Sequence, residues 1–142
     1  MSKHIIATLL LFTTLSVSST SLEELPTHIH SEVHCLAQNI YHEARGEPLA
    51  GQLAVANVTM NRVYSGTFPN SVCKVVYQRG QFSWTAKKSP TRNIPKEFVD
   101  MATRVIIHER VDNTNGSLFF ANKSVPVKRR QTKRIGNHIF YK

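Results

Sequence analysis

The stretch that decides the fold is residues 31–64, SEVHCLAQNIYHEARGEPLAGQLAVANVTMNRVY. Its first half carries apolar side chains at helical spacing, which predicts a helix that begins near Ser31, a residue able to cap it, and stops at Gly46. The apolar face of this helix comprises Val33, Leu36, Ala37, Ile40 and Ala44. Pro48 is suited to the start of a second helix. Because residues 49–64 are apolar all round the helix axis, that helix is expected at the buried centre of the domain.

Glu43 occupies an unusual place in the first helix. It follows Leu36 by seven residues, so its carboxyl lies at the edge of the apolar face. It also lies in the last turn, where the negative end of the helix dipole disfavours a carboxylate. Partial burial acts in the same direction, so we expect a raised pKa for Glu43, as a general acid near neutral pH requires. The alternative is a surface glutamate whose side chain extends into solvent.

The rest of the chain predicts a single domain of the α+β class that is mainly helical. A brief apolar element at residues 72–77 precedes a polar loop at residues 81–84, and a third helix begins near Pro95. Short strands are predicted at residues 118–120 and 138–141, at the two ends of a basic segment.

The net charge of +9 arises from 18 Lys and Arg against 9 Asp and Glu. Such a surface favours a polyanionic partner, namely nucleic acid, anionic lipid or the acidic envelope of a bacterium. The N-terminus favours the envelope, because Lys3 precedes an uncharged run over residues 5–22 with an apolar centre and a Ser-rich tail, as in a secretory signal. A short buried helix and a weak membrane anchor are the alternatives.

We therefore expect residues 1–20 to be a signal peptide, residues 21–34 a lead-in segment and residues 35–142 the folded domain. The expected location is the periplasm, the cell envelope or the extracellular space. Nucleic acid is then not an expected partner, and contact with a membrane is expected only through an uncleaved signal. We expect a monomer without a cofactor.

Export also bears on the redox state of Cys35 and Cys73, which are the only two cysteines of the sequence. An oxidising compartment permits them to form a disulfide. Closing a loop of that length would stabilise the fold by roughly 4 kcal/mol in the chain-entropy model. The alternative is a pair of buried free thiols. Neither cysteine lies in a CxxC motif, so redox catalysis has no support.

Several ordered blocks cover roughly residues 35–141 of the chain. They are IYHEARGEP at 40–48, GQLAVA at 51–56, NRV at 61–63, FP at 68–69, Cys73 with VVY at 75–77, QFSW at 81–84 and IGNHIFY at 135–141. Together these blocks resemble the SleB-type cell wall hydrolase family, which includes spore-cortex-lytic enzymes and phage or bacterial envelope hydrolases. The resemblance implies a lysozyme-like fold and lytic transglycosylase activity on peptidoglycan. The first Glu of the EARGE block, here Glu43, is implied to be the catalytic residue.

One segment departs from the family pattern. Before the final block the family often carries an aromatic-His pair and a Pro-x-Trp, whereas this chain has FAN at residues 120–122 and PVK at residues 126–128. No substrate role is therefore carried over to these positions.

A single essential acid fits the sequence. A glycosidase with two carboxylates needs a second acid opposite the first. A lytic transglycosylase needs only one, which protonates the leaving glycosidic oxygen and then helps the C6 hydroxyl of muramic acid attack its own C1. Glu47 is the nearest rival, but it precedes Pro48 and is suited to cap the second helix. The remaining acids near the start of the mature chain and around the third helix more often solvate a surface: Glu23, Glu24, Glu32, Glu97, Asp100, Glu109 and Asp112.

A glycan site also needs flat apolar surfaces together with amide and hydroxyl groups. The loop at residues 81–84 offers this mixture, and the alternative is that its aromatic residues are core. A satisfied core histidine is the alternative for the histidine of the terminal strand. Asn61 and Arg62 are expected to brace the buried helix. The candidate substrate-binding residues are Gln81, Phe82, Ser83, Trp84, His138, Tyr141 and Glu47.

A zinc-dependent amidase that cuts the peptide stem is the first rival function. His30 and His34 have the i, i+4 spacing of metal ligands, with His28 nearby. Against it, Glu43 is not part of an HExxH motif, because Gly46 stands where the second His would be. No metal ligand is assigned.

A non-catalytic module that binds an anionic wall polymer or nucleic acid is the second rival. A basic run of this kind is more often a solvated segment. Pure polyanion binding would weaken steeply with salt, whereas glycan cleavage leaves covalent products. The basic residues are Lys128, Arg129, Arg130, Lys133 and Arg134.

Overall fold

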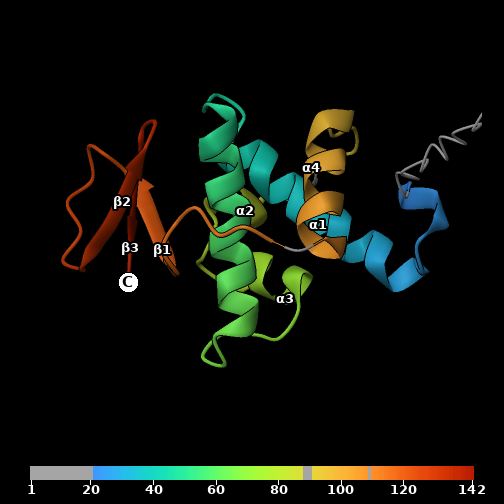
Figure 1. Cartoon of the computed structure of the whole chain (residues 1–142), viewed down its shortest axis with the longest axis horizontal. Helices are drawn as coiled ribbons and strands as arrows, with labels where there is room; N and C mark the ends of the chain where they lie inside the picture. The colour runs from blue at the N-terminus through green and yellow to red at the C-terminus, as the bar shows by residue number, and fades with distance from the viewer. Residues whose placement is uncertain (1–20, 88–90, 109) are drawn as a thin grey trace, which may run out of the picture.

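The computed structural model describes residues 21–87, 91–108 and 110–142, so the predicted signal peptide at residues 1–20 lies outside the described residues. The described chain is mainly helical and ends in a small sheet (Figure 1). In chain order the elements are η1 (Leu22–Glu24), α1 (Thr27–Ala44), α2 (Leu49–Tyr64), α3 (Val72–Val76), η2 (Ser83–Ala86), α4 (Lys96–Ile107), β1 (Phe119–Asn122), β2 (Gln131–Ile135) and β3 (His138–Tyr141).

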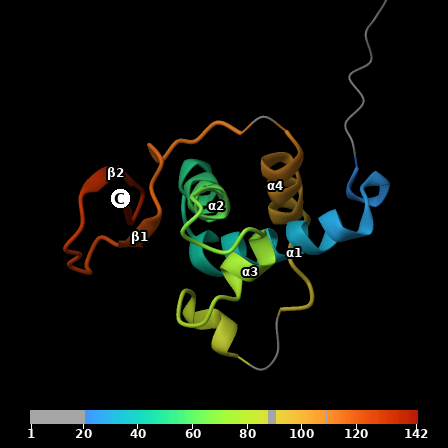
Figure 2. The same cartoon turned by 90° about the horizontal axis from the view of Figure 1, so that it is seen from below.

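The helices pack together, and the sheet lies at one end of the molecule beside α2 (Figure 1). α1 contacts α2, α3 and α4, whereas α2 also contacts β1 and β2. Seen from below, α2 lies between the sheet and α4 (Figure 2). Because α2 has neighbours on opposite sides, it is buried on most of its circumference, and the predicted buried central helix is confirmed.

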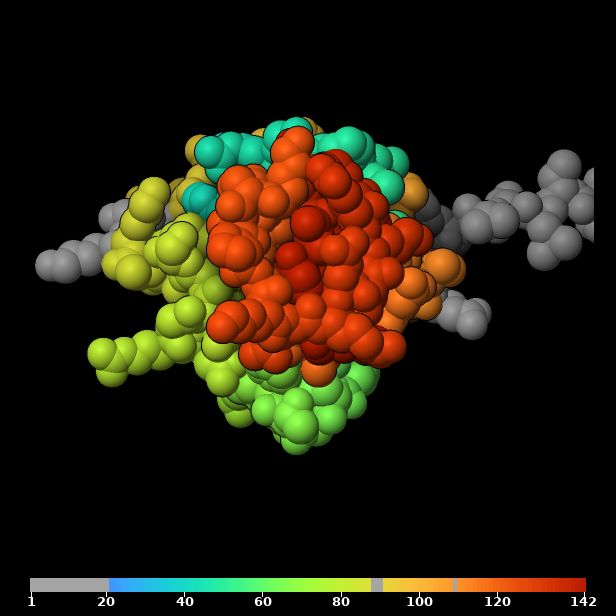
Figure 3. All heavy atoms as spheres, turned by 90° about the vertical axis from the view of Figure 1, so that its left-hand side faces the viewer, coloured from blue at the N-terminus to red at the C-terminus, as the bar shows by residue number. Residues whose placement is uncertain are grey.

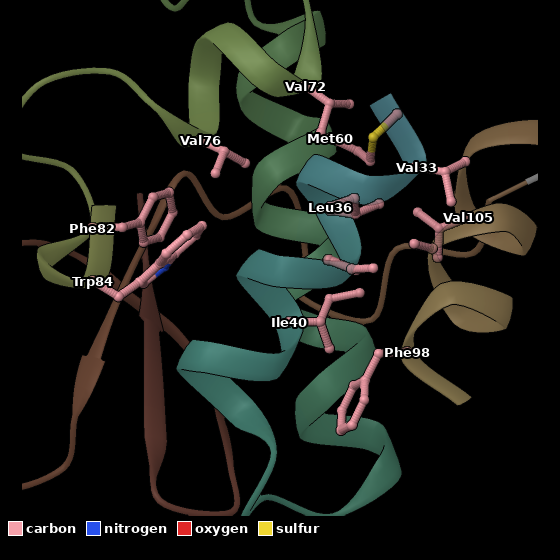
Figure 4. Close-up of a cluster of buried hydrophobic side chains, with 13 residues drawn as sticks. Val33, Leu36, Ile40, Met60, Val72, Val76, Phe82, Trp84, Phe98 and Val105 are labelled. Atoms are coloured by element: carbon pink, nitrogen blue, oxygen red, sulfur yellow. The ribbon is translucent and has the colours of Figure 1, made fainter. Parts of the chain in front are cut away.

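Two clusters of buried side chains form the core. In the larger cluster, Leu36 and Ile40 of α1 lie between Phe82 and Trp84 on one side and α4 on the other (Figure 4). The smaller cluster joins α2 to the sheet and comprises Ala54, Val58 and Phe140. Phe120 packs against both clusters, so the sheet and the helices share one continuous interior.

The prolines mark helix starts. Pro48 and Pro95 occupy the N-cap positions of α2 and α4, close to the predicted starts. The predicted start of the first helix at Ser31 is wrong, because α1 begins at Thr27 after Pro26. The extra turn brings Ile29 against the core, so residues 27–34 of the expected lead-in are helical.

The sheet is antiparallel with the order β1-β3-β2. β1 and β3 correspond to the two predicted strands, and Phe120 pairs with Phe140 across them. The edge strand β2 was not predicted, because Gln131–Ile135 lacks the apolar alternation of a half-buried strand. Lys133 pairs with Phe140 on the other side of β3, after an irregularity in register that follows Gln131.

A disulfide between Cys35 and Cys73 joins α1 to α3, as predicted. Beside it, the carboxylate of Glu32 accepts a hydrogen bond from the backbone N–H of Val72, in the first turn of α3. A covalent and a polar contact therefore fix the short α3 against α1. Within the described ranges, no helix combines the length and the apolar character needed to cross a bilayer.

Candidate active site at the C-terminal end of α1

Glu43 lies in the last turn of α1, where it is half-buried. Burial raises the pKa of the Glu43 carboxyl above its ordinary value, and the positive charge of Arg62 opposes this rise only in part. The direction agrees with the sequence prediction, and the main cause, desolvation of the charged form, is one of the two causes that were predicted. Glu43 can therefore hold a proton at a pH where an exposed glutamate has lost it.

The buried guanidinium of Arg62, on α2, is the charged group that acts on the Glu43 carboxyl. Its side chain is only 4% exposed, and its Nε donates a hydrogen bond of 2.7 Å to the carbonyl of Leu118. Burial lowers the pKa of Arg62 to about 10, so the guanidinium stays charged at neutral pH. In the part of the chain that the structure describes, Nη1 of Arg62 has no hydrogen-bond partner.

Aromatic rings surround that guanidinium. Its central carbon lies 5.0 Å from the ring centroid of Phe68, 5.4 Å from that of Phe82 and 5.6 Å from that of Phe119. Rings at these distances attract a cation while keeping water away from it. The arrangement therefore fixes one positive charge that acts on Glu43 when this residue loses its proton and becomes a carboxylate.

Glu47 ties the sheet to the end of α1. Its Oε2 accepts a hydrogen bond of 2.8 Å from the backbone N–H of Asn137, and its Oε1 accepts one of 3.1 Å from the Asn137 side chain. Desolvation raises the pKa of Glu47, but the two hydrogen bonds outweigh it and the net shift is downward. The expectation that Glu47 caps α2 is wrong, because its side chain is committed to the turn between β2 and β3.

His138 and Tyr141 of β3 are buried, with exposed fractions of 7% and 5%. The ring of His138 lies 5.1 Å from that of Phe120, edge to face. Burial lowers the pKa of His138, while the nearby Glu47 acts against this. Within the described residues Nδ1 of His138 has no hydrogen-bond partner.

The loop at residues 81–84 divides its side chains between solvent and core. Gln81 and Ser83 are exposed, whereas Phe82 and Trp84 belong to the larger core cluster. Trp84 donates from Nε1 to the side chain of Asn39 at 3.2 Å and stacks on His42 at 4.5 Å between ring centroids. The two aromatic side chains therefore pack in the interior, and Trp84 contacts His42, which precedes Glu43 in the sequence.

Asn61 and its neighbours brace α2, as expected. The side chain of Asn61 donates 2.9 Å to the carbonyl of Ser117 and accepts 2.8 Å from Arg110. Asp112 accepts from the side chain and the backbone N–H of Thr114, from the backbone N–H of Gly116 and from the side chain of Asn61. Desolvation raises the pKa of Asp112, but these hydrogen bonds together outweigh it. This network fixes the segment that leads from α4 to β1.

The other described acids either form hydrogen bonds or an ion pair, or lie exposed on η1 and α4. Glu32 binds the start of α3, Asp100 pairs with Lys96, and Asp112 binds its own turn. Three further acids are exposed on η1 and α4, namely Glu23, Glu24 and Glu97. Glu109 lies outside the described residues. Among the described acids, Glu43 is thus the one that is half-buried, has a raised pKa and has no hydrogen-bond partner within the described chain.

Metal ligation has no support among the described residues, where no group of three or more His, Cys, Asp or Glu could hold an ion. Of the three histidines near the start of α1, His30 is engaged with the carbonyl of Leu25 at 2.8 Å. A cavity between η1 and α4 is lined by none of the candidate site residues.

Arg62 and Asn137 are site residues whose roles sequence reasoning missed. Both stand within blocks of the family resemblance, NRV and IGNHIFY. An arginine in a helix that has no other charged residue was a signal for a functional charge, but its direction toward Glu43 depends on packing between α2 and α1. The contact of Asn137 with Glu47 spans 90 residues of chain and had no local signal.

Residues 46–141 match the Cell Wall Hydrolase family. The chain is 33% identical over 121 residues to the spore cortex-lytic enzyme of Bacillus cereus, a match that covers 79% of this chain and 44% of that enzyme. The chain thus spans less than half the length of the spore cortex-lytic enzymes it matches.

Two solved structures are similar over most of the chain. The catalytic domain of the Bacillus cereus SleB protein has 35% identity and a TM-score of 0.69, covering 80% of this chain and 91% of that one. The catalytic domain of the germination-specific lytic transglycosylase SleB from Bacillus anthracis has 31% identity and a TM-score of 0.73, covering 83% and 100%. The chain belongs to the cell wall hydrolase family, and its fold is the predicted lysozyme-like one.

Proposed function

We propose that this protein is a peptidoglycan hydrolase that cuts the β-1,4 bond between N-acetylmuramic acid and N-acetylglucosamine, with Glu43 as its single catalytic acid. The observation that carries the proposal is the half-buried Glu43 carboxyl, shifted to a higher pKa by burial, with the charged guanidinium of Arg62 acting on it. Membership of the cell wall hydrolase family supplies the substrate class.

The reaction uses both protonation states of one carboxyl. Protonated Glu43 donates its proton to the glycosidic oxygen while the bond from that oxygen to C1 of the muramic sugar breaks. The carboxylate that remains then accepts the proton of the C6 hydroxyl as O6 attacks C1. The products are a free sugar hydroxyl and a 1,6-anhydro-muramic end, and Glu43 regains its proton without consuming water.

Arg62 favours this cycle electrostatically. The carboxylate form of Glu43 exists between the two proton transfers, and burial alone would make it costly. The buried charge of Arg62 reduces that cost, since an attraction between charges is strong where water is excluded. A second carboxylate on the opposite side of the sugar, which a two-acid glycosidase needs, has no candidate of comparable burial and pKa shift among the described acids.

Substrate contacts are assigned to polar groups around Glu43. The exposed Gln81 and Ser83 offer amide and hydroxyl groups to the N-acetyl arms of the sugars. His138 offers the buried ring nitrogen that lacks a partner in the described structure. Phe82, Trp84 and Tyr141 support the site from the interior, and Glu47 keeps the β2–β3 turn in place.

The site of action is outside the cytoplasm, where the cell wall lies. The disulfide between Cys35 and Cys73 agrees with an oxidising compartment, and the sequence at residues 1–20 is suited to direct export. Intact-mass analysis of protein recovered from the cell envelope is expected to show a start between about Ser18 and Glu23. Full-length chain found only in the cytosol would contradict export.

The proposal is tested by two matched substitutions in a peptidoglycan-digestion assay. Glu43→Gln preserves shape but cannot deliver a proton, so it should remove nearly all turnover and leave the thermal unfolding transition cooperative. Glu47→Gln should retain more activity and act through stability, because Glu47 holds a turn. With the wild type, the rate should fall as pH rises through the raised pKa of Glu43, since the acid form is consumed. A fully active Glu43→Gln variant would overturn the assignment.

A further inference from the structure

The positive charge of the chain is concentrated in its last thirty residues. Residues 113–142 contain seven Lys and Arg and no Asp or Glu, so they carry seven of the nine net positive charges. All seven side chains are exposed. They belong to the β1–β2 connection, to β2 and to the C-terminus, and we call them the basic sheet face: Lys123, Lys128, Arg129, Arg130, Lys133, Arg134 and Lys142.

These residues share one end of the molecule. Figure 3 shows the sheet and its connections gathered on the face that looks away from α1 and α4. The backbone N–H of Lys142 donates 3.0 Å to the carbonyl of Arg130, which places the C-terminus beside the β1–β2 connection. The guanidinium carbon of Arg129 lies 3.6 Å from the ring centroid of Phe119, so this connection is anchored on β1.

Within the described chain, no acid forms an ion pair within 4.0 Å with a cation of this face. Two carboxylates reach the segment, and both are committed to hydrogen bonds with it. Glu47 uses both oxygens on Asn137, and Asp112 binds the backbone of Thr114 and Gly116. The described ion pair within 4.0 Å, between Lys96 and Asp100, lies on α4. The cations of the basic sheet face are therefore available to anions from outside the chain.

The face also adjoins the candidate active site. Asn137, in the turn that β2 enters, is hydrogen-bonded to Glu47, four residues after Glu43. On the other edge of the sheet, the backbone N–H of Lys123 donates 2.8 Å to the carbonyl of Asn137, and the charge of Lys123 acts on Glu47. A glycan strand bound at Glu43 would therefore have the sheet beside it.

We propose that the basic sheet face binds the carboxylates of the peptide stems carried by the glycan strand, and so gives the enzyme a preference for stem-bearing peptidoglycan. This inference rests on the function proposed above. In a stem-bearing strand the lactyl carboxyl of each N-acetylmuramic acid is an uncharged amide, so the stems supply the negative charges of the strand. Exposed cations at the rim of an interface increase the association rate and its dependence on salt more than they change the chemistry.

Single-stranded nucleic acid fits the face less well. Proteins that bind such strands combine cations with exposed aromatic side chains on which bases stack. In residues 113–142, all of which are described, no aromatic side chain is exposed: Phe119 is covered by Arg129, and Phe140 and Tyr141 are buried. The face offers positive charge but no exposed aromatic rings. Carboxylate groups need only the positive charge, whereas bases also need the rings.

The test measures binding without cleavage, so that it does not depend on turnover. The full chain carrying Glu43→Gln is mixed with soluble glycan strands from peptidoglycan that has been freed of phosphodiester polymers with hydrofluoric acid. One portion is released by an endopeptidase that cuts the cross-links, and it keeps its stems. The other has lost its stems to an amidase, and the lactyl carboxylates freed by that cleavage are capped as methylamides. The sheet variant adds four exposed substitutions, Lys128→Gln, Arg130→Gln, Lys133→Gln and Arg134→Gln. The matched control removes the same charge elsewhere, through Lys74→Gln, Arg79→Gln, Arg92→Gln and Arg104→Gln.

The Glu43→Gln parent and the matched control should bind stem-bearing material about tenfold more tightly than stripped material, since each exposed ion pair contributes a factor of about two. The sheet variant should lose this preference, and salt at about 500 mM should remove it for every protein. A preference retained by the sheet variant would overturn the inference, as would equal binding of the parent to both materials. So would binding that appears only on walls whose phosphodiester polymers have been kept. Wild-type cleavage products test the proposed function separately.

Discussion

Replacing Gly136 by alanine tests the contact that ties the sheet to the end of α1. Gly136 has a φ of 57°, and a Cβ at this position would overlap Oε2 of Glu47 and lie 3.1 Å from Cδ of Pro48. Gly66 is the matched control. It has a φ of 73°, but an added Cβ would meet nothing within 4 Å. Both substitutions place an alanine in a left-handed backbone conformation, but only Gly136→Ala disturbs the Glu47 contact.

Both substitutions should lower the free energy of unfolding, and the two losses should differ by the contribution of the contact between Glu47 and Asn137. A left-handed alanine costs about 1 kcal/mol in either variant. Displacing Glu47 weakens two partly exposed hydrogen bonds to Asn137, which adds about 1–2 kcal/mol. At about 4 °C per kcal/mol for a domain of this size, Gly66→Ala should lower Tm by about 4 °C and Gly136→Ala by about 10 °C.

Thermal unfolding followed by circular dichroism measures both values. Glu47→Ala supplies the second arm of a double-mutant cycle, because in its background the Gly136→Ala substitution should cost no more than Gly66→Ala does. Gly136→Ala should also lose more hydrolytic activity than Gly66→Ala, since the displaced turn adjoins Glu43. Equal Tm losses at the two glycines, in the presence of Glu47, would refute the reasoning.

Further predictions concern the disulfide and the buried acid. Replacing Cys35 and Cys73 together by serine opens a loop with a sequence separation of 38, so the chain-entropy model predicts a loss of about 4 kcal/mol, measured by urea unfolding without reductant. A variant as stable as the oxidised wild type would contradict this. Because the folded-state pKa of Glu43 is raised, its contribution to stability is complete below its unfolded pKa and falls as pH rises through the folded value. Glu43→Gln should therefore match the wild type in Tm at about pH 4 and exceed it at about pH 8, whereas a gap that does not grow with pH would exclude burial as the cause.

Much of the helical core followed from the sequence. The bounds of α2 were predicted because Pro48 precedes a segment that is apolar all round, and Gly66 follows it. The position of Glu43 at the edge of the apolar face followed from its spacing from Leu36, whereas its catalytic role was implied by the resemblance of the EARGE block to the family. The helix bounds and the position of Glu43 depend on local periodicity, which a single sequence displays.

Features that depend on tertiary contacts were not predicted. β2 consists largely of exposed polar and charged residues, so only its pairing with β3 reveals it as a strand. The start of α1 at Thr27 is polar and becomes helical where Ile29 reaches the core. The sequence also left open whether Phe82 and Trp84 face sugar or the interior, because an aromatic residue in a polar loop suits both.

The central claim is that one carboxyl, Glu43, serves in turn as acid and base, and the sugar ends left by the wild-type enzyme test it most directly. Purified peptidoglycan is digested, and the soluble fragments are identified by mass spectrometry before and after borohydride reduction. We predict 1,6-anhydro-muramic ends, which are lighter by one water than reducing ends and do not take up hydride. Reducing muramic ends would show that water is the nucleophile, and the single-acid account would then be contradicted.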